Sequence, residues 1–152
     1  SGSDAKAAVV DVALGAIDAM EVFCSHDEPS MEMWYRFLNT GFHVALSAGS
    51  DAFINQSFTF VAGGVRSYVH TGAEVSYKSW IDGLRRGRSF ATAGPLLFFE
   101  VEDQLPGHEF RFAQGPVTLN AKARVLSNVQ VERLEIVANG KVMATSTSSS
   151  AR

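Results

Sequence analysis

The chain has 152 residues, of which 46% are hydrophobic and 19% are charged, and its formal net charge is -3 at pH 7. This length and composition are typical of one domain or two small ones with a buried core, and they exclude a disordered chain. The 13 Lys and Arg against 16 Asp and Glu leave no basic excess to attract a nucleic acid. The apolar runs are too short to cross a bilayer, so we expect a soluble protein with no membrane partner.

The single cysteine, Cys24, excludes an intramolecular disulfide framework and a multi-cysteine zinc cluster. The first three residues have linker composition, and no basic segment followed by an apolar one comes after them, so no signal peptide is visible. The sequence therefore does not indicate a cellular compartment.

The first half of the chain alternates helix and strand. Apolar residues at helical spacing predict helices over residues 4–14 and 29–40, and short apolar runs predict buried strands over residues 17–23 and 42–48. Strand, helix and strand joined by short links form a βαβ unit. We therefore expect the two strands to be adjacent and parallel, with a right-handed crossover.

The second half changes to a period of two. Apolar and polar residues alternate in a way that is typical of a sheet with one face in water. The dipeptide Asn139-Gly140 is a strong signal for a type I′ hairpin turn. We therefore expect an α/β portion followed by an antiparallel, sandwich-like β portion. The remaining predicted elements are a helix over residues 76–86 and strands over residues 65–70, 95–101, 110–113, 117–126, 131–137 and 141–145.

Polar loops follow both strands of the predicted βαβ unit. Because parallel strands end at the same edge, His26 after the first strand and Asp51 after the second should lie close together, with Glu21 near the end of the first strand. Carboxylate and imidazole groups suit a divalent metal that activates water. The structural alternative is that such polar loops are ordinary and that acidic residues favour a helix N-terminus. No HxH or HExxH pair occurs, so we do not expect a complete site within the chain.

Two further groups of residues have a functional and a structural interpretation. Cys24 could be a nucleophile with His26 as its base, but a lone cysteine beside an apolar strand also fits a small core residue. Arg85, Arg86 and Arg88 could hold an anion, or they could form the solvated end of a helix, where the helix dipole favours cations.

Several segments match one known family in their order along the chain, and one of them holds Gly49-Ser50-Asp51. Together they resemble carbaryl-hydrolase-like metallohydrolases of the PHP superfamily, over residues 12–139. The family's last metal-ligand segment maps onto Asp51. The wider superfamily often has a histidine two positions later, where this chain has Phe53. The matching segments are residues 12–22, 34–42, 48–53, 64–69 and 87–97.

The resemblance implies a fold and a domain organisation. Residues 1–88 would be the last βα units of a PHP-type, TIM-like barrel, and residues 89–152 a truncated β-sandwich-like domain. An exposed barrel edge would then favour a homo-oligomer.

The resemblance also implies a function. The chain would be the C-terminal fragment of a hydrolase that uses Zn, Mn or Fe to cleave an ester, carbamate or phosphoester in a small molecule. Because the family's HxH segment is absent, the fragment alone should be inactive and should bind metal weakly or not at all, with Asp51 as the ligand and Glu21 and His26 as its neighbours. The alternative is a non-catalytic β-sandwich binding module with an α/β adaptor.

Overall fold

The computed structural model describes residues 4–23, 28–56 and 61–147, which form three helices and eight strands. The chain divides into two compact units. The first unit holds residues 1–93 and 106–110, and the second holds residues 94–105 and 111–152.

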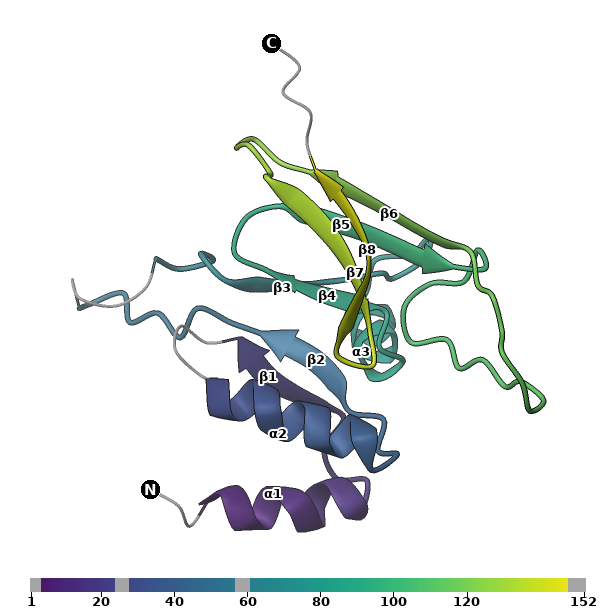
Figure 1. Cartoon of the computed structure of the whole chain (residues 1–152). Coiled ribbons are helices and arrows are strands. Elements are labelled where there is room, and N and C mark those ends of the chain that lie inside the picture. Colours follow the sequence, from purple (N-terminus) through teal and green to yellow (C-terminus); the bar gives the residue numbers. More distant parts are fainter. Residues whose placement is uncertain (1–3, 24–27, 57–60, 148–152) are drawn as a thin grey trace. The chain divides into compact units, whose positions relative to one another are not determined.

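The first unit begins with a βαβ arrangement. Helix α1 (Asp4–Ala13) is followed by β1 (Ala19–Phe23), α2 (Glu28–Asn39) and β2 (Ala45–Ala48). Strands β1 and β2 pair in parallel, and α2 packs on β1 (Figure 1). The predicted parallel pairing is therefore confirmed, and it fixes which residues share an edge of this small sheet.

The core of this arrangement lies between α1, α2 and the start of β2. Val12, Phe37 and Val44 are buried there, and Trp34 and Phe42 pack against them. The Trp34 indole Nε1 donates a hydrogen bond of 2.9 Å to the Val44 carbonyl oxygen. This bond satisfies the polar atom of a large aromatic side chain, and it ties α2 to the segment that leads into β2.

The rest of the first unit is a helix inserted into a hairpin. Strand β3 (Arg66–Val69) pairs antiparallel with β4 (Ser89–Thr92), and α3 (Tyr77–Arg85) lies between them in sequence. Helix α3 begins with a capping box, in which the amide nitrogens of Ser76 and Ser79 each donate to the other's hydroxyl oxygen. This reciprocal cap satisfies two amides that the first turn of a helix leaves open.

Serine side chains join β2 to this hairpin. The Ser67 hydroxyl accepts a bond of 2.7 Å from the Ala48 amide and donates one of 3.1 Å to the Ala48 carbonyl. The Ser89 hydroxyl donates a bond of 3.1 Å to the Leu46 carbonyl. The two serine hydroxyls thus bond to backbone groups of β2 that the backbone of a neighbouring strand would otherwise bind.

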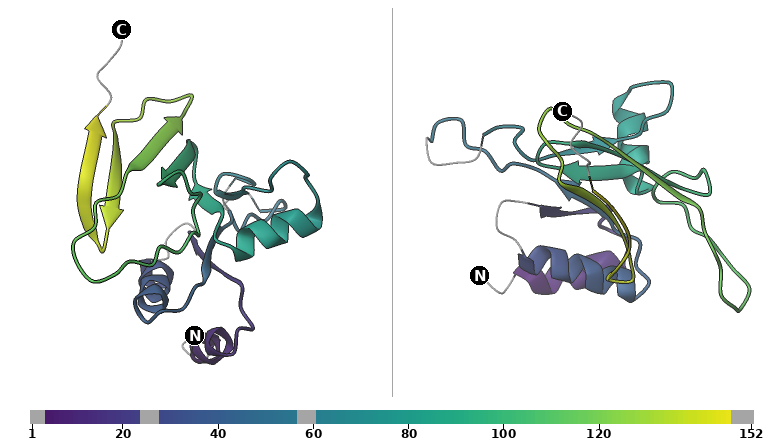
Figure 2. Two further views of the ribbon diagram at one scale, coloured as in Figure 1. Left: turned by 90° about the vertical axis from the view of Figure 1, so that its right-hand side faces the viewer. Right: turned by 45° about the horizontal axis from the view of Figure 1, so that its top comes forward.

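The second unit contains two antiparallel pairs of strands (Figure 2). Strand β5 (Leu96–Val101) pairs with β6 (Ala121–Leu126), and β7 (Arg133–Ala138) pairs with β8 (Lys141–Thr147). Asn139 and Gly140 join β7 to β8 with φ angles of 51° and 73°. The predicted hairpin at this dipeptide is therefore confirmed.

The predicted fold class is wrong. The described strands form four two-stranded sheets, one parallel and three antiparallel, and no closed barrel is present among them. In a barrel, each strand bonds to the next through backbone hydrogen bonds. Here the hydroxyls of Ser67 and Ser89 bond to backbone groups of β2 instead. The two strand pairs of the second unit also do not make a sandwich, because no hydrophobic side chain described in that unit is buried.

Several predicted strands differ from the structure. Residues 110–113 lie outside the strands, β6 begins at Ala121 instead of residue 117, and β4 was not predicted at all. The chain passes from the first unit to the second between residues 110 and 111. This passage interrupts the alternating pattern that had suggested a strand there.

Candidate functional site

The candidate site lies at the edge where β1 and β2 both end. Phe23 and Ala48 are opposite each other in the parallel register, so β1 and β2 end at the same edge of the sheet (Figure 1). Two of the residues considered from the sequence, Cys24 and His26, lie outside the described residues. The described part of the site is therefore built from the end of β1 and the loop after β2.

Glu21 contributes the first carboxylate of the site. It lies opposite Ser47 in the β1–β2 register, and its side chain reaches over Gly49. A Cβ atom built on Gly49 would lie 3.1 Å from the Glu21 Oε1 and 3.9 Å from its Oε2. The missing side chain of Gly49 thus leaves room for this exposed carboxylate beside the loop that carries Asp51.

Asp51 contributes the second carboxylate, three residues after the end of β2. It is exposed and has a φ of 44°, in the left-handed region that aspartate tolerates better than most residues. The loop is held by the Ser50 hydroxyl, which accepts a bond of 3.0 Å from the Gly63 amide. The structure therefore brings Glu21 and Asp51, both considered from the sequence, to the same edge of the sheet.

Arg66 borders the same edge and was not predicted from the sequence. It forms an isolated antiparallel bridge with Gly49, and its Nη1 donates a bond of 2.6 Å to the Gly63 carbonyl. Its guanidinium carbon lies 5.7 Å from the centre of the Tyr68 ring, which stacks on Phe90 with a centroid distance of 5.2 Å. The alternation of Arg66 and Tyr68 along a predicted strand was the only signal in the sequence that could have placed them on one face.

The donors at this edge fit a loosely held, hard divalent cation. Carboxylate oxygens suit Mg²⁺ and Mn²⁺, and Mg²⁺ usually keeps several water ligands when a protein supplies one or two carboxylates. Within the described ranges, no group of three or more His, Cys, Asp or Glu side chains is placed to hold a metal ion. Glu21 and Asp51 alone would therefore supply only part of a coordination shell.

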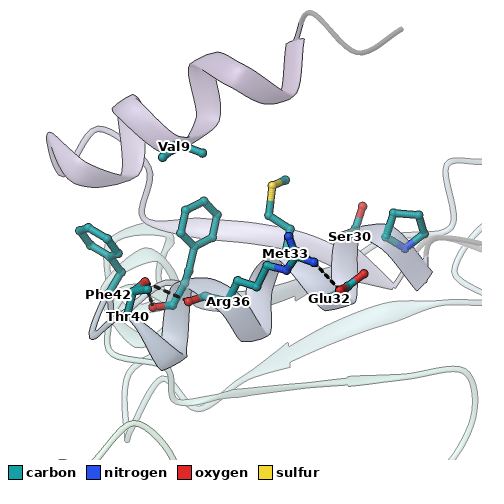
Figure 3. Close-up of a pocket in the computed structure, with 9 residues that line it drawn as sticks. Val9, Ser30, Glu32, Met33, Arg36, Thr40 and Phe42 are labelled. Atoms are coloured by element: carbon teal, nitrogen blue, oxygen red, sulfur yellow. Dashed lines mark hydrogen bonds and ion pairs between the residues drawn. The ribbon is translucent and has the colours of Figure 1, made fainter.

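A separate groove of about 680 Å³ lies between α1 and α2 (Figure 3). Val9 of α1 and Met33 of α2 face each other across it. Three of its polar side chains bond to neighbouring residues: Arg36 pairs with Glu32 at 2.6 Å, and the Thr40 hydroxyl donates to helix carbonyls. Neither Glu21 nor Asp51 lines this groove, so it is distinct from the candidate cation site.

The three arginines at the end of α3 differ in their surroundings. Arg85 pairs with Asp18 at 2.9 Å, between the last turn of α3 and the residue before β1. Arg86 is exposed, whereas Arg88 is half-buried. The ion pair gives Arg85 a structural partner, and the interpretation of these arginines as an anion site stays a prediction.

Comparison with known proteins found no matching family, no matching curated protein and no matching solved structure. None of the helices in the described part of the chain has the length and hydropathy needed to span a bilayer.

Proposed function

We propose that this chain contributes a pair of carboxylates to the divalent-cation site of a hydrolase that cleaves an ester, carbamate or phosphoester. One observation carries the proposal: the parallel pairing of β1 and β2 brings Glu21 and the loop of Asp51 to one edge. Both carboxylates are exposed there, so water and a small substrate could reach them. The remaining ligands would come from outside the described residues.

Glu21 and Asp51 would hold the cation through their carboxylate oxygens. A divalent cation in such a site supplies Lewis-acid chemistry, because it lowers the pKa of a bound water and polarises a carbonyl or phosphoryl oxygen. Two exposed carboxylates hold such an ion weakly, with a dissociation constant of about 10⁻⁴ to 10⁻³ M. We therefore expect weak binding and no hydrolysis by the chain alone.

Titration with Mn²⁺, with the free ion measured by electron paramagnetic resonance, tests this proposal. Asp51→Asn removes the charge but keeps a residue type that tolerates the left-handed backbone, and we expect it to weaken binding about tenfold or more. Glu74→Gln removes an exposed carboxylate elsewhere and should leave binding unchanged.

Two results would contradict the proposal. Equal affinity in the wild type and in Asp51→Asn would show that Asp51 is not a ligand. Tight, stoichiometric binding would show that the number of ligands within the chain is larger than two carboxylates.

A second candidate function is partner binding by the second unit. In the β5–β6 register, residues opposite each other share a face, and one face contains only apolar side chains. Phe99 and Ala121 of this face are exposed and its other residues are half-buried, and a partly exposed apolar face on a small sheet is typical of an interaction surface. The residues of this face are Leu97, Phe99, Val101, Ala121, Ala123 and Val125. If Mn²⁺ binding proves independent of Asp51, this candidate becomes the better of the two.

A further inference from the structure

We infer that Ser67 is a positioning residue for the candidate cation site, because its hydroxyl fixes the end of β2 from which the Asp51 loop departs. The inference rests on the proposed function for its metal readout. Its effect on the backbone can be measured without metal.

The Ser67 hydroxyl makes two bonds to one residue. It accepts from the Ala48 amide at 2.7 Å and donates to the Ala48 carbonyl at 3.1 Å. A serine hydroxyl has one donor and two acceptor sites, so it can make both bonds at once. Ala48 is buried, and its backbone groups would lose their partner if the hydroxyl were removed.

The position of Ala48 controls both carboxylates. Gly49 follows directly, and the Glu21 carboxylate lies beside it, 3.1 Å from where a Cβ atom of residue 49 would be. Asp51 lies two residues further along, in a left-handed conformation. A shift at Ala48 would therefore move the backbone on which Glu21 rests and the loop that carries Asp51. Substitutions that disturb the groups orienting a metal ligand typically weaken binding by about 10- to 100-fold.

Ser89 provides a matched control on the neighbouring strand. Its hydroxyl donates a single bond of 3.1 Å to the Leu46 carbonyl, two residues before Ala48. Ser89 and Ser67 therefore make the same kind of contact with the same strand. Of these two serines, Ser67 alone bonds to the last residue of β2, so its loss and not that of Ser89 should loosen the Asp51 loop.

The experiment compares Ser67→Ala, Ser67→Thr and Ser89→Ala in the full chain. Mn²⁺ affinity is measured by electron paramagnetic resonance, and exchange of the Gly49, Ser50 and Asp51 amides is measured by nuclear magnetic resonance without metal. We expect Ser67→Ala to weaken Mn²⁺ binding about tenfold or more and to accelerate exchange of these three amides. Ser67→Thr keeps a hydroxyl and should restore both values, and Ser89→Ala should leave both close to the wild type.

Several outcomes would overturn the inference. Unchanged exchange of the three amides in Ser67→Ala would do so, as would failure of Ser67→Thr to restore it. Faster exchange across all of β1 to β4 in Ser67→Ala would indicate general unfolding of the unit and would likewise reject a positioning role. If Asp51→Asn binds Mn²⁺ like the wild type, the proposed function fails, while the exchange data still decide whether Ser67 holds the loop.

Discussion

Gly107 allows two backbone segments of the first unit to come closer than any side chain would permit. It has a φ of 83°, and a Cβ atom built on it would overlap the Arg86 carbonyl oxygen and lie 2.8 Å from the Arg86 carbonyl carbon. The same atom would be 3.0 Å from the carbonyl carbon of Gly87. Because these neighbours are backbone atoms just after α3, they cannot rotate away as the end of a side chain could.

We expect Gly107→Ala to lower the free energy of unfolding by about 2 to 4 kcal/mol, since it combines left-handed strain with a steric overlap. Gly72→Ala is a matched control in the same unit: Gly72 has a φ of 79°, but a Cβ there would have no atom within 4 Å. This control should cost about 1 to 2 kcal/mol, the strain alone. Urea denaturation followed by tryptophan fluorescence compares them, and equal losses would show that the overlap relaxes without cost.

The turn after β5 is tight, but its residue types are not those from which such a turn is usually predicted. Val101 and Gln104 exchange backbone hydrogen bonds of 3.1 and 2.9 Å, and Glu102 and Asp103 between them have φ angles of 49° and 58°. Glycine and asparagine are the usual residues in such a turn. Glu102 and Asp103 therefore did not predict a turn here, in contrast to Asn139 and Gly140.

We expect Asp103→Gly to raise the free energy of unfolding of the second unit by about 0.5 kcal/mol, because glycine adopts positive φ without strain. The change removes an exposed contact with Lys122, and such contacts stabilise little. Glu102→Gly should instead be destabilising, because the Glu102 carboxylate accepts bonds from the Asn120 amide and side chain. Urea denaturation of both variants measures the difference, and a stabilising Glu102→Gly would contradict it.

The contribution of this turn to the stability of the folded state depends on pH. The hydrogen bond from Lys122 to Asp103 raises the pKa of the Lys122 amine above its ordinary value of 10.5. A raised pKa stabilises the folded state below pH 10.5, and this contribution is lost as the pH rises through the folded-state value. The advantage of Asp103→Gly should therefore increase above pH 10.5.

Elements defined by local pattern were predictable, whereas those defined by distant partners were not. The parallel pairing of β1 and β2 followed from short links around one helix, and α3 followed from its cap and apolar stripe. Strand β4 was missed because its four residues acquire strand geometry by pairing with β3, 20 or more residues earlier in the chain. The expected barrel failed for a related reason, since nothing in the local pattern showed that serine hydroxyls would occupy the side of β2.

At the scale of the whole chain, the candidate site also contains residues that could be predicted from local pattern and residues that could not. Glu21 and Asp51 could be placed at one edge from strand order alone, because parallel strands end together. The positions of Ser67 and Arg66 at this edge could not be predicted. The partner of Ser67, Ala48, is 19 residues away, and the partner of Arg66, Gly49, is 17 residues away, across a segment with no periodic pattern.

Exposed apolar side chains are common on α1 and α2. Helix α1 buries Val12, whereas Val10 and Leu14 beside it are 56% and 76% exposed, and Tyr35 and Leu38 of α2 are also exposed. A helix of 10 residues is marginal in water without packing on most of its apolar surface. Since the side of β2 toward the hairpin is closed by serine hydroxyls, these helices are the better place for a second copy to bind.

We therefore expect the chain to form a homodimer at tens of micromolar, roughly where contacts of moderate area associate. Leu14→Glu places a charge on the exposed side of the α1 region and should shift the chain toward monomer. Met143→Glu changes a similarly exposed apolar residue of β8, 68% accessible, and should leave the association unchanged. Sedimentation equilibrium measures all three proteins. A monomeric wild type would show that the exposed helices need no partner, and dissociation by Met143→Glu alone would place the contact on the second unit.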